Sequence, residues 1–246
     1  MMRVPRWTLA AAAVAVVAAV VLVVALRDDL FVRGSRIETP VGEVRDATLS
    51  DGTVVTLGAK SQLDHDVREG KRRVKLLEGE AFFVVTEDAG RPFIVSIDDV
   101  SVIAVGGKFE VRRRAEGVNV AVLEGSVEVA QPAAKPVHVQ AGEGVTAVKQ
   151  RQLEVGSVRP NDIGAWREGR MVYENATLGD LAADAHRYGT ARIIIETPQL
   201  AKQRITSSFR AAQVEGVLQT LQVALPITIR RESNGDIVVR ARVGPP

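Results

Sequence analysis

Residues 117–130 read GVNVAVLEGSVEVA, and this stretch decides the fold class of the larger part of the chain. Val118, Val120 and Val122 alternate with polar or small residues, which is the two-residue period of a strand with one buried face. The Glu124-Gly125 pair interrupts this run before a second alternating run begins. The stretch therefore predicts two strands joined by a tight turn.

Turn pairs that end in glycine recur on both sides of this stretch. They are Asp51-Gly52, Glu69-Gly70, Glu78-Gly79, Ala89-Gly90, Gly106-Gly107, Glu116-Gly117 and Glu124-Gly125. A spacing of about ten residues is typical of sandwiches, rolls and barrels, because each strand must reverse after crossing one core. Strand-like residues resume after the QPAAKP segment at 131–136, which we interpret as a long loop. We therefore expect residues 37–156 to form one all-β domain, a sandwich or a rolled sheet.

The sequence pattern changes at Arg159-Pro160-Asn161-Asp162, and these turn-forming residues predict an irregular connection. Apolar residues at helical spacing then predict two amphipathic helices, the first between Thr177 and Gly189 and the second ending before Pro226. Strand-like runs flank both helices. We therefore expect residues 163–243 to form a small α+β domain of two β-α-β halves.

The last two strand-like runs, Ile227–Ile229 and Ile237–Val239, flank an Asn234-Gly235 pair that is a strong hairpin signal. No later segment of the sequence is available to cover the outer side of the last strand. Unpaired backbone groups on such an edge recruit strands from other proteins. Our candidate partner-binding residues are therefore Ile227, Ile229, Ile237 and Val239.

Near the N-terminus, residues 9–26 read LAAAAVAVVAAVVLVVAL, without a charge, a proline or a glycine. A helix of this length nearly crosses a bilayer core of about 30 Å. We expect a single transmembrane helix that runs from Leu9 to Leu26, with Trp7 as its interfacial anchor.

The flanking charges orient this helix. Arg3 and Arg6 precede the apolar run, and basic flanks stay in the cytoplasm. We expect residues 1–8 to be a short cytoplasmic tail, residues 27–36 a juxtamembrane linker and the remainder periplasmic, in a single-pass protein of the bacterial inner membrane. The alternative is a cleaved signal peptide, whose apolar region usually has about 7–15 residues. Both interpretations export everything after Arg27.

The composition excludes several classes of protein. The 32 basic and 30 acidic residues give a formal net charge of +2, so no global field is available to hold nucleic acid. The sequence has no cysteine, which removes disulfides, thiolate zinc sites and cysteine nucleophiles. It also has no phosphate-binding glycine loop and no hydrolase motif. We therefore expect no catalytic, cofactor-binding or metal-binding residues, and we do not expect an enzyme.

The remaining polar and aromatic clusters favour structural roles. The histidines, at 65, 138 and 186, do not have a metal-binding spacing, and Asp64-His65-Asp66 is interpreted as a solvated turn. Arg72-Arg73 and Arg112-Arg113-Arg114 are interpreted as solvated charge runs on or beside strands. Trp166 and Tyr173 are core residues in this interpretation, with partner-binding aromatics as the alternative.

Several spaced motifs resemble those of the FecR family, membrane-anchored regulators of iron-uptake signalling in Gram-negative bacteria. They are Thr39-Pro40-Val41-Gly42-Glu43, residues 49–57 (LSDGTVVTL), residues 77–84 (LEGEAFFV), Arg91-Pro92-Phe93-Ile94-Val95 and residues 122–127 (VLEGSV). The C-terminal segment resembles the short N-terminal domain of secretins and TonB-dependent receptors. The residues that carry that likeness are Trp166, Gly169, Tyr173, Leu181, Arg187, Tyr188 and the Leu225-Pro226-Ile227 turn.

Two features depart from the family pattern. A Gly-Thr pair usually precedes the Phe of the mid-domain strand, whereas here Gly107 is followed by Lys108 and Phe109. Family members also usually carry a cytoplasmic helical segment that holds a sigma factor, and only Met1 to Arg6 precede the apolar run in this sequence. Direct contact with a sigma factor is therefore expected only if a cytoplasmic segment exists.

The resemblance implies a function in transmembrane signalling. It suggests a periplasmic part that contacts the signalling domain of an outer-membrane TonB-dependent transducer and an inner-membrane protein that controls a sigma factor. A periplasmic scaffold that holds envelope polymer or an assembly partner is the alternative. An enzyme is the third hypothesis, and a convergent acid-base cluster would be needed to support it.

Overall fold

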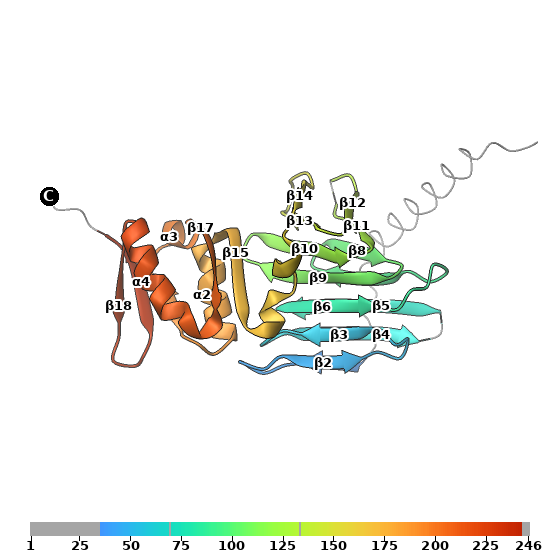
Figure 1. The fold of residues 1–246 in the computed structure, drawn as a ribbon, viewed down its shortest axis with the longest axis horizontal. Helices are drawn as coiled ribbons and strands as arrows, with labels where there is room; N and C mark the ends of the chain where they lie inside the picture. Colours follow the sequence, from blue (N-terminus) through green and yellow to red (C-terminus); the bar gives the residue numbers. More distant parts are fainter. Residues whose placement is uncertain (1–34, 69, 133, 243–246) are drawn as a thin grey trace, which may run out of the picture.

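The computed structural model describes residues 35–242, except residues 69 and 133 (Figure 1). The expected transmembrane helix at 9–26 and its anchors Trp7, Leu9 and Leu26 lie outside these residues. Within the described part, no helix is both long and apolar enough to cross a membrane.

Two seven-stranded sheets stack face to face over most of the described chain. In spatial order, the first sheet contains β1 (Ser35–Glu38), β4 (Gln62–Arg68), β5 (Lys71–Glu78), β7 (Phe93–Ile97), β8 (Val100–Ala104), β11 (Ser126–Ala130) and β12 (Val137–Gln140). The second contains β14 (Val155–Ser157), β13 (Glu143–Ala147), β10 (Gly117–Glu124), β9 (Gly107–Arg114), β6 (Glu80–Val85), β3 (Val54–Leu57) and β2 (Arg45–Thr48). The expectation of an all-β domain is confirmed, and its form is a sandwich.

The sandwich is closed by an aromatic and aliphatic core. The Phe83 ring lies 5.2 Å from Phe109 of the same sheet and 5.8 Å from Phe93 of the opposite sheet, measured between centroids. The three rings are fully buried, and so are the alternating valines of β10. The two-residue period therefore identifies the inner face correctly, because one face of each strand packs on the other sheet.

Glycine at position 79 is required by the turn between β5 and β6. Its φ is 84°, and a Cβ there would lie 1.9 Å from the side-chain oxygen of Ser61. A side chain would therefore clash and strain the backbone. This turn delivers the next residue, Glu80, to a buried position on the outer face of the second sheet.

The C-terminal part packs against one end of the sandwich (Figure 1). Its elements are the 3₁₀ turns η1 (Pro160–Asp162) and η2 (Ala165–Glu168), β15 (Arg170–Thr177), α2 (Leu178–Arg187), β16 (Ile193–Ile195), α3 (Pro198–Ala201), β17 (Arg204–Arg210), η3 (Ala211–Gln213), α4 (Val214–Ala224), β18 (Ile227–Arg231) and β19 (Ile237–Ala241). β15 pairs with β17, and β16, β19 and β18 form a three-stranded sheet in that order.

The C-terminal part shares its core with the sandwich. Phe82 and Ala121, on the outer face of the second sheet, belong to the same buried cluster as Trp166, Leu181 and Phe209. Trp166 and Tyr173 are both buried in this cluster, which confirms their interpretation as core residues. The buried core of the C-terminal part therefore extends onto the outer face of the second sheet.

One sequence-based expectation about the last hairpin is wrong. β18 and β19 do form a hairpin, but β19 is the central strand of its sheet. β16, which comes earlier in the chain, pairs in parallel with β19 and covers the side of β19 that we expected to be open. Ile237 and Val239 therefore do not lie on an edge.

Two smaller interpretations also need correction. Asp64-His65-Asp66 lies within strand β4 rather than in a turn, and its two carboxylates pair with arginines. Arg72 and Arg112 are buried rather than solvated. His186 is exposed on α2, as expected from its place on the polar side of the helix.

Candidate functional site

Four buried charged side chains form a closed ring where the C-terminal part meets the sandwich. Arg112 Nε lies 2.6 Å from Glu80 Oε2, and Arg187 Nη2 lies 2.8 Å from Glu80 Oε1. Arg187 Nη2 also lies 2.7 Å from Asp184 Oδ1, and a longer ion contact of 3.5 Å from Arg112 Nη2 to Asp184 Oδ2 closes the ring. Glu80 and Arg112 come from the sandwich, whereas Asp184 and Arg187 come from α2. We call these four residues the charge ring.

Local structure explains how these residues meet. Glu80 and Arg112 are opposite each other in neighbouring strands β6 and β9, with both side chains on the outer face of the sheet. Asp184 and Arg187 are three residues apart on α2, so they share one face of the helix. The start of α2 is fixed by a capping box in which Thr177 and Asp180 bond to each other's backbone N–H groups.

The same capping residue also ties α2 to the sandwich. Asp180 Oδ1 accepts a 3.0 Å hydrogen bond from the backbone N–H of Ala115, which follows β9. At the other end of the helix, the backbone N–H of Gly42 donates to the carbonyl of Arg187 at 2.9 Å. Both ends of α2 are therefore held by backbone groups of the sandwich.

Further donors surround the two acidic residues of the charge ring. Arg114 Nη1 lies 2.7 Å from Asp184 Oδ2, and the Tyr173 hydroxyl donates to the same oxygen at 3.1 Å. The Tyr188 hydroxyl donates to Glu80 Oε1 at 2.5 Å. Each carboxylate therefore has more than one donor, which offsets the cost of removing its charge from water.

The electrostatics agree with charged carboxylates in the ring. Burial raises the pKa of Glu80, but the neighbouring arginines outweigh burial and hold that pKa below its usual value. The same balance, with Arg114 as the largest opposing cation, lowers the pKa of Asp184. The Arg112 and Arg187 guanidiniums have raised pKa values because the acidic partners outweigh their burial. The ring therefore stays ionised at neutral pH.

A second anchor lies beside the ring. Glu110 accepts hydrogen bonds from the Gly164 backbone N–H at 2.9 Å and from Trp166 Nε1 at 3.0 Å. Burial is the largest cause of the raised pKa of Glu110. The Arg167 guanidinium carbon lies 3.7 Å from the centroid of the Phe82 ring, in cation–π geometry. The segment that connects the two parts is therefore held on the second sheet by specific side-chain contacts.

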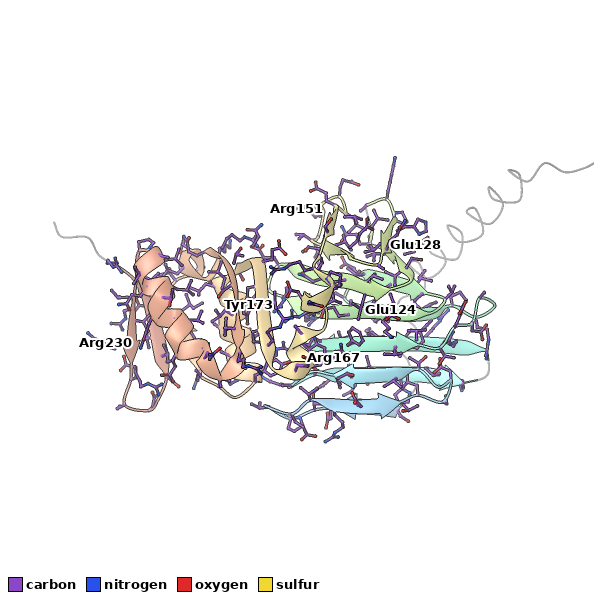
Figure 2. All side chains as sticks on the ribbon, in the orientation of Figure 1. Glu124, Glu128, Arg151, Arg167, Tyr173 and Arg230 are labelled. Atoms are coloured by element: carbon purple, nitrogen blue, oxygen red, sulfur yellow. The ribbon has the colours of Figure 1, made fainter. Side chains whose placement is uncertain are left out.

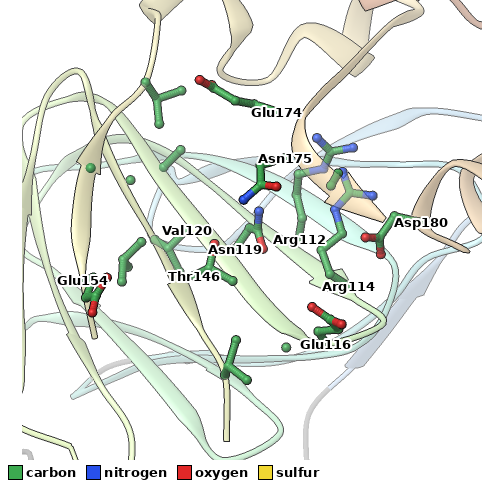
Figure 3. Close-up of a pocket in the computed structure, with 18 of the residues that line it drawn as sticks. Arg112, Arg114, Glu116, Asn119, Val120, Thr146, Glu154, Glu174, Asn175 and Asp180 are labelled. Carbon is green, nitrogen blue, oxygen red and sulfur yellow. The ribbon is translucent and has the colours of Figure 1, made fainter. Parts of the chain in front are cut away.

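A cleft of about 770 Å³ opens next to the ring, between the second sheet and β15 (Figure 3). Arg112 and Arg114 lie at one end, Glu154 lies toward the other, and Asn119 and Asn175 lie between them. No group of three or more potential metal ligands exists among the described residues. The cleft has mixed charge and shows no nucleophile paired with a base.

The candidate partner-binding residues lie elsewhere, at the far end of the C-terminal part. Ile227, Ile237 and Val239 are buried, and Ile229 is partly buried against the same core. Their side chains therefore serve packing. Sequence reasoning missed the charge ring because it read the arginines at 112–114 as one solvated run. A strand turns alternate residues to the same face, so the signal was that Arg112 and Arg114 share a face with Glu110.

Comparison with known proteins bears on the first part of the chain. Residues 35–128 match the family model for FecR protein. We call this matched region the FecR domain. This FecR domain supplies Glu80 and Arg112 to the charge ring.

Two solved structures resemble a larger part of the chain. Both are crystal structures of a proposed anti-sigma factor from Parabacteroides distasonis ATCC 8503, at 2.50 and 1.65 Å resolution. They are 27% and 26% identical to this chain, and each has a TM-score of 0.75. Each match covers 84% of this chain and 98% or 99% of the other, so it extends beyond the FecR domain. The search of curated proteins gave no match. The matches are to a regulatory kind of protein and support a regulatory role.

Proposed function

We propose that this chain is the signal-receiving part of a FecR-type transmembrane regulator. In this proposal, residues 9–26 anchor it in the inner membrane with the N-terminus in the cytoplasm, and the described residues lie in the periplasm. They contact the signalling domain of an outer-membrane TonB-dependent transducer, and the protein controls a sigma factor. The FecR domain and the likeness to a proposed anti-sigma factor support this proposal.

The observation that carries the proposal is the charge ring. A receiver that is anchored near one end and contacted near the other must transmit the contact through its whole length. The ring joins a FecR strand pair to the helix α2, and both ends of α2 are also bonded to the sandwich. A contact made on the C-terminal part would therefore move the sandwich with it.

The test is a transcription reporter in the native host. Cells carry a promoter that depends on the sigma factor encoded nearest to this gene, fused to a fluorescent protein. Deletion of the gene should change the reporter output several-fold and remove its response to the transducer's inducer. An unchanged output together with a leaky or misshapen envelope would favour the scaffold hypothesis instead.

Membrane topology is tested separately. Alkaline phosphatase, which is active only after export, is fused after Arg242 of the full chain. We expect activity, and we expect fractionation to place the fusion in the inner membrane. An inactive fusion would contradict the proposed orientation, and a soluble active fusion would show that residues 9–26 are removed as a signal peptide.

A further inference from the structure

The three-stranded sheet of the C-terminal part has two edges, and the β18 edge is closed at Ile227 and at the N–H of Ile229. Thr228 and Arg230 are paired with β19, so the backbone groups of Ile227, Ile229 and Arg231 point away from the sheet. The outward N–H of Ile229 donates to Gln222 Oε1 at 2.8 Å. The outward N–H and C=O of Ile227 bond to the Leu225 carbonyl and the Arg242 guanidinium. An incoming strand would have to displace these bonds.

The β16 edge, on the other side of the same sheet, is open. The Arg192 carbonyl accepts from the Ile237 N–H, and the Glu196 N–H donates to the Val239 carbonyl. Backbone groups alternate sides along a strand, so Ile194 also faces β19 whereas Ile193 and Ile195 face outward. Within the described ranges, the outward N–H and C=O groups of Ile193 and Ile195 have no hydrogen-bond partner.

Side chains beside this edge fit a particular kind of strand. Ile194 is one of few large apolar side chains exposed among the described residues, at 39%, and it points to the solvent face of the sheet. Arg192 directly precedes β16, and its side chain is 67% exposed. The nearest carboxylate oxygen, Asp236 Oδ2, lies 3.8 Å from Arg192 Nη1. The edge therefore offers an exposed apolar side chain, Ile194, and beside it a cation, Arg192, that only a distant carboxylate neutralises.

We propose that the open edge of β16 accepts an extended strand from a partner protein, which becomes the fourth strand of this sheet. The inference rests on the proposed function and deepens it, because the partner is the transducer's signalling domain. The incoming strand bonds to the outward backbone groups of Ile193 and Ile195, places an apolar side chain against Ile194 and presents a carboxylate to Arg192. Backbone bonds give affinity in such strand addition, and the side chains give selectivity.

The experiment compares two prolines in the full chain, held in detergent micelles. Ile195→Pro removes an outward N–H at the open edge without removing a bond to β19. Arg231→Pro removes an outward N–H at the opposite edge, on β18, and is the matched control. The probe is the purified N-terminal signalling domain of the TonB-dependent transducer encoded nearest to this gene. Circular dichroism checks the fold, and affinity is measured by calorimetry.

We expect Ile195→Pro to weaken binding at least tenfold and Arg231→Pro to leave it unchanged. Hydrogen exchange of the unmodified chain gives an independent readout if Ile195→Pro does not fold. The segment around residues 192–196 should become protected in the complex, whereas the segment around 227–231 should not change. Wild-type affinity in a folded Ile195→Pro variant, or no added protection at 192–196, would overturn the inference while the proposed function stands. If the unmodified chain does not bind the probe, the proposed function fails and the inference fails with it.

Discussion

The interior of the sandwich and its junction with the C-terminal part are both buried, but different groups fill them. The sandwich interior contains the stacked rings of Phe83 and Phe109 and a lattice of valines. The junction contains the charge ring, in which Glu80 is as deeply buried as those phenylalanines. Figure 2 shows the labelled Tyr173 at this junction, between the sandwich and the helices of the C-terminal part.

This difference between an apolar interior and a charged junction indicates different roles for the two regions. Apolar packing is non-directional, so it stabilises the sandwich without demanding one exact arrangement. A buried ion pair contributes little net stability over an apolar alternative, yet removing one partner is costly because the other charge is left uncompensated. The ring therefore acts chiefly to fix the orientation of α2 on the FecR domain. The predictions below probe that contrast, from the largest expected effect to the smallest.

The largest effect is expected where the shared apolar core is broken. Leu181 is fully buried on α2, so Leu181→Asp places an unpaired carboxylate in that core. The cost is several kcal/mol, comparable to the stability of a whole domain, so the C-terminal part should unfold. Ala183→Asp on the exposed face of the same helix is the control and should melt like the unmodified chain. A cooperative, near-normal melt of Leu181→Asp would show that the packing of α2 has been misassigned.

A single ring residue should have the next largest effect. Glu80→Gln leaves Arg112 and Arg187 facing a neutral group, and breaking a buried pair in this way costs about 3–5 kcal/mol. Glu78→Gln is the control, since Glu78 is two residues away, is 45% exposed and reaches Lys60 only at 3.9 Å. Urea unfolding should separate the two variants clearly. Equal midpoints for both variants would mean that the ring contributes nothing.

Acid should weaken the junction before it weakens the sandwich. The pKa values of Glu80 and Asp184 are lowered in the folded chain, so the stability they supply is present above the unfolded carboxyl pKa of about 4 and is lost as pH falls through the folded values. Glu110 has a raised pKa and acts in the opposite sense, because its cost disappears as it is protonated. Hydrogen exchange between pH 7 and pH 3 should therefore show α2 opening first. Simultaneous loss of protection in α2 and β10 would contradict this order.

The smallest effect is expected at the rim of the ring. Tyr188→Phe removes only the hydroxyl that donates to Glu80, and a hydrogen bond to a charged group is worth about 1.5–3 kcal/mol. The arginine contacts of Glu80 remain in this variant. Thermal unfolding should show a loss smaller than that of Glu80→Gln. A larger loss would place the main support of Glu80 in the tyrosine rather than in the arginines.

The sequence predicts the local features of this molecule well and its long-range ones poorly. The alternation at Val118, Val120 and Val122 identifies strand β10 and its inner face because that signal is contained within a few residues. The charge ring could not be predicted in the same way, because its sandwich half and its α2 half are separated by tens of residues. Alternation places Arg112 and Glu110 on one strand face, but it does not say which later segment covers that face. The central position of β19 could not be predicted for the same reason. Its neighbour β16 lies about forty residues earlier in the chain and pairs with it in parallel through a crossover connection.

The central claim is that the FecR domain and α2 are coupled through the charge ring, and a double-mutant cycle on Glu80 and Arg187 tests it most directly. Glu80→Gln, Arg187→Met and the double variant are unfolded with urea in the full chain, on a Trp7→Phe background that leaves Trp166 as the only fluorescent tryptophan. Coupling predicts that the double variant loses less stability than the sum of the single losses, by more than about 1 kcal/mol. Losses that add to within about 0.5 kcal/mol would show that the two residues act independently and would contradict the claim.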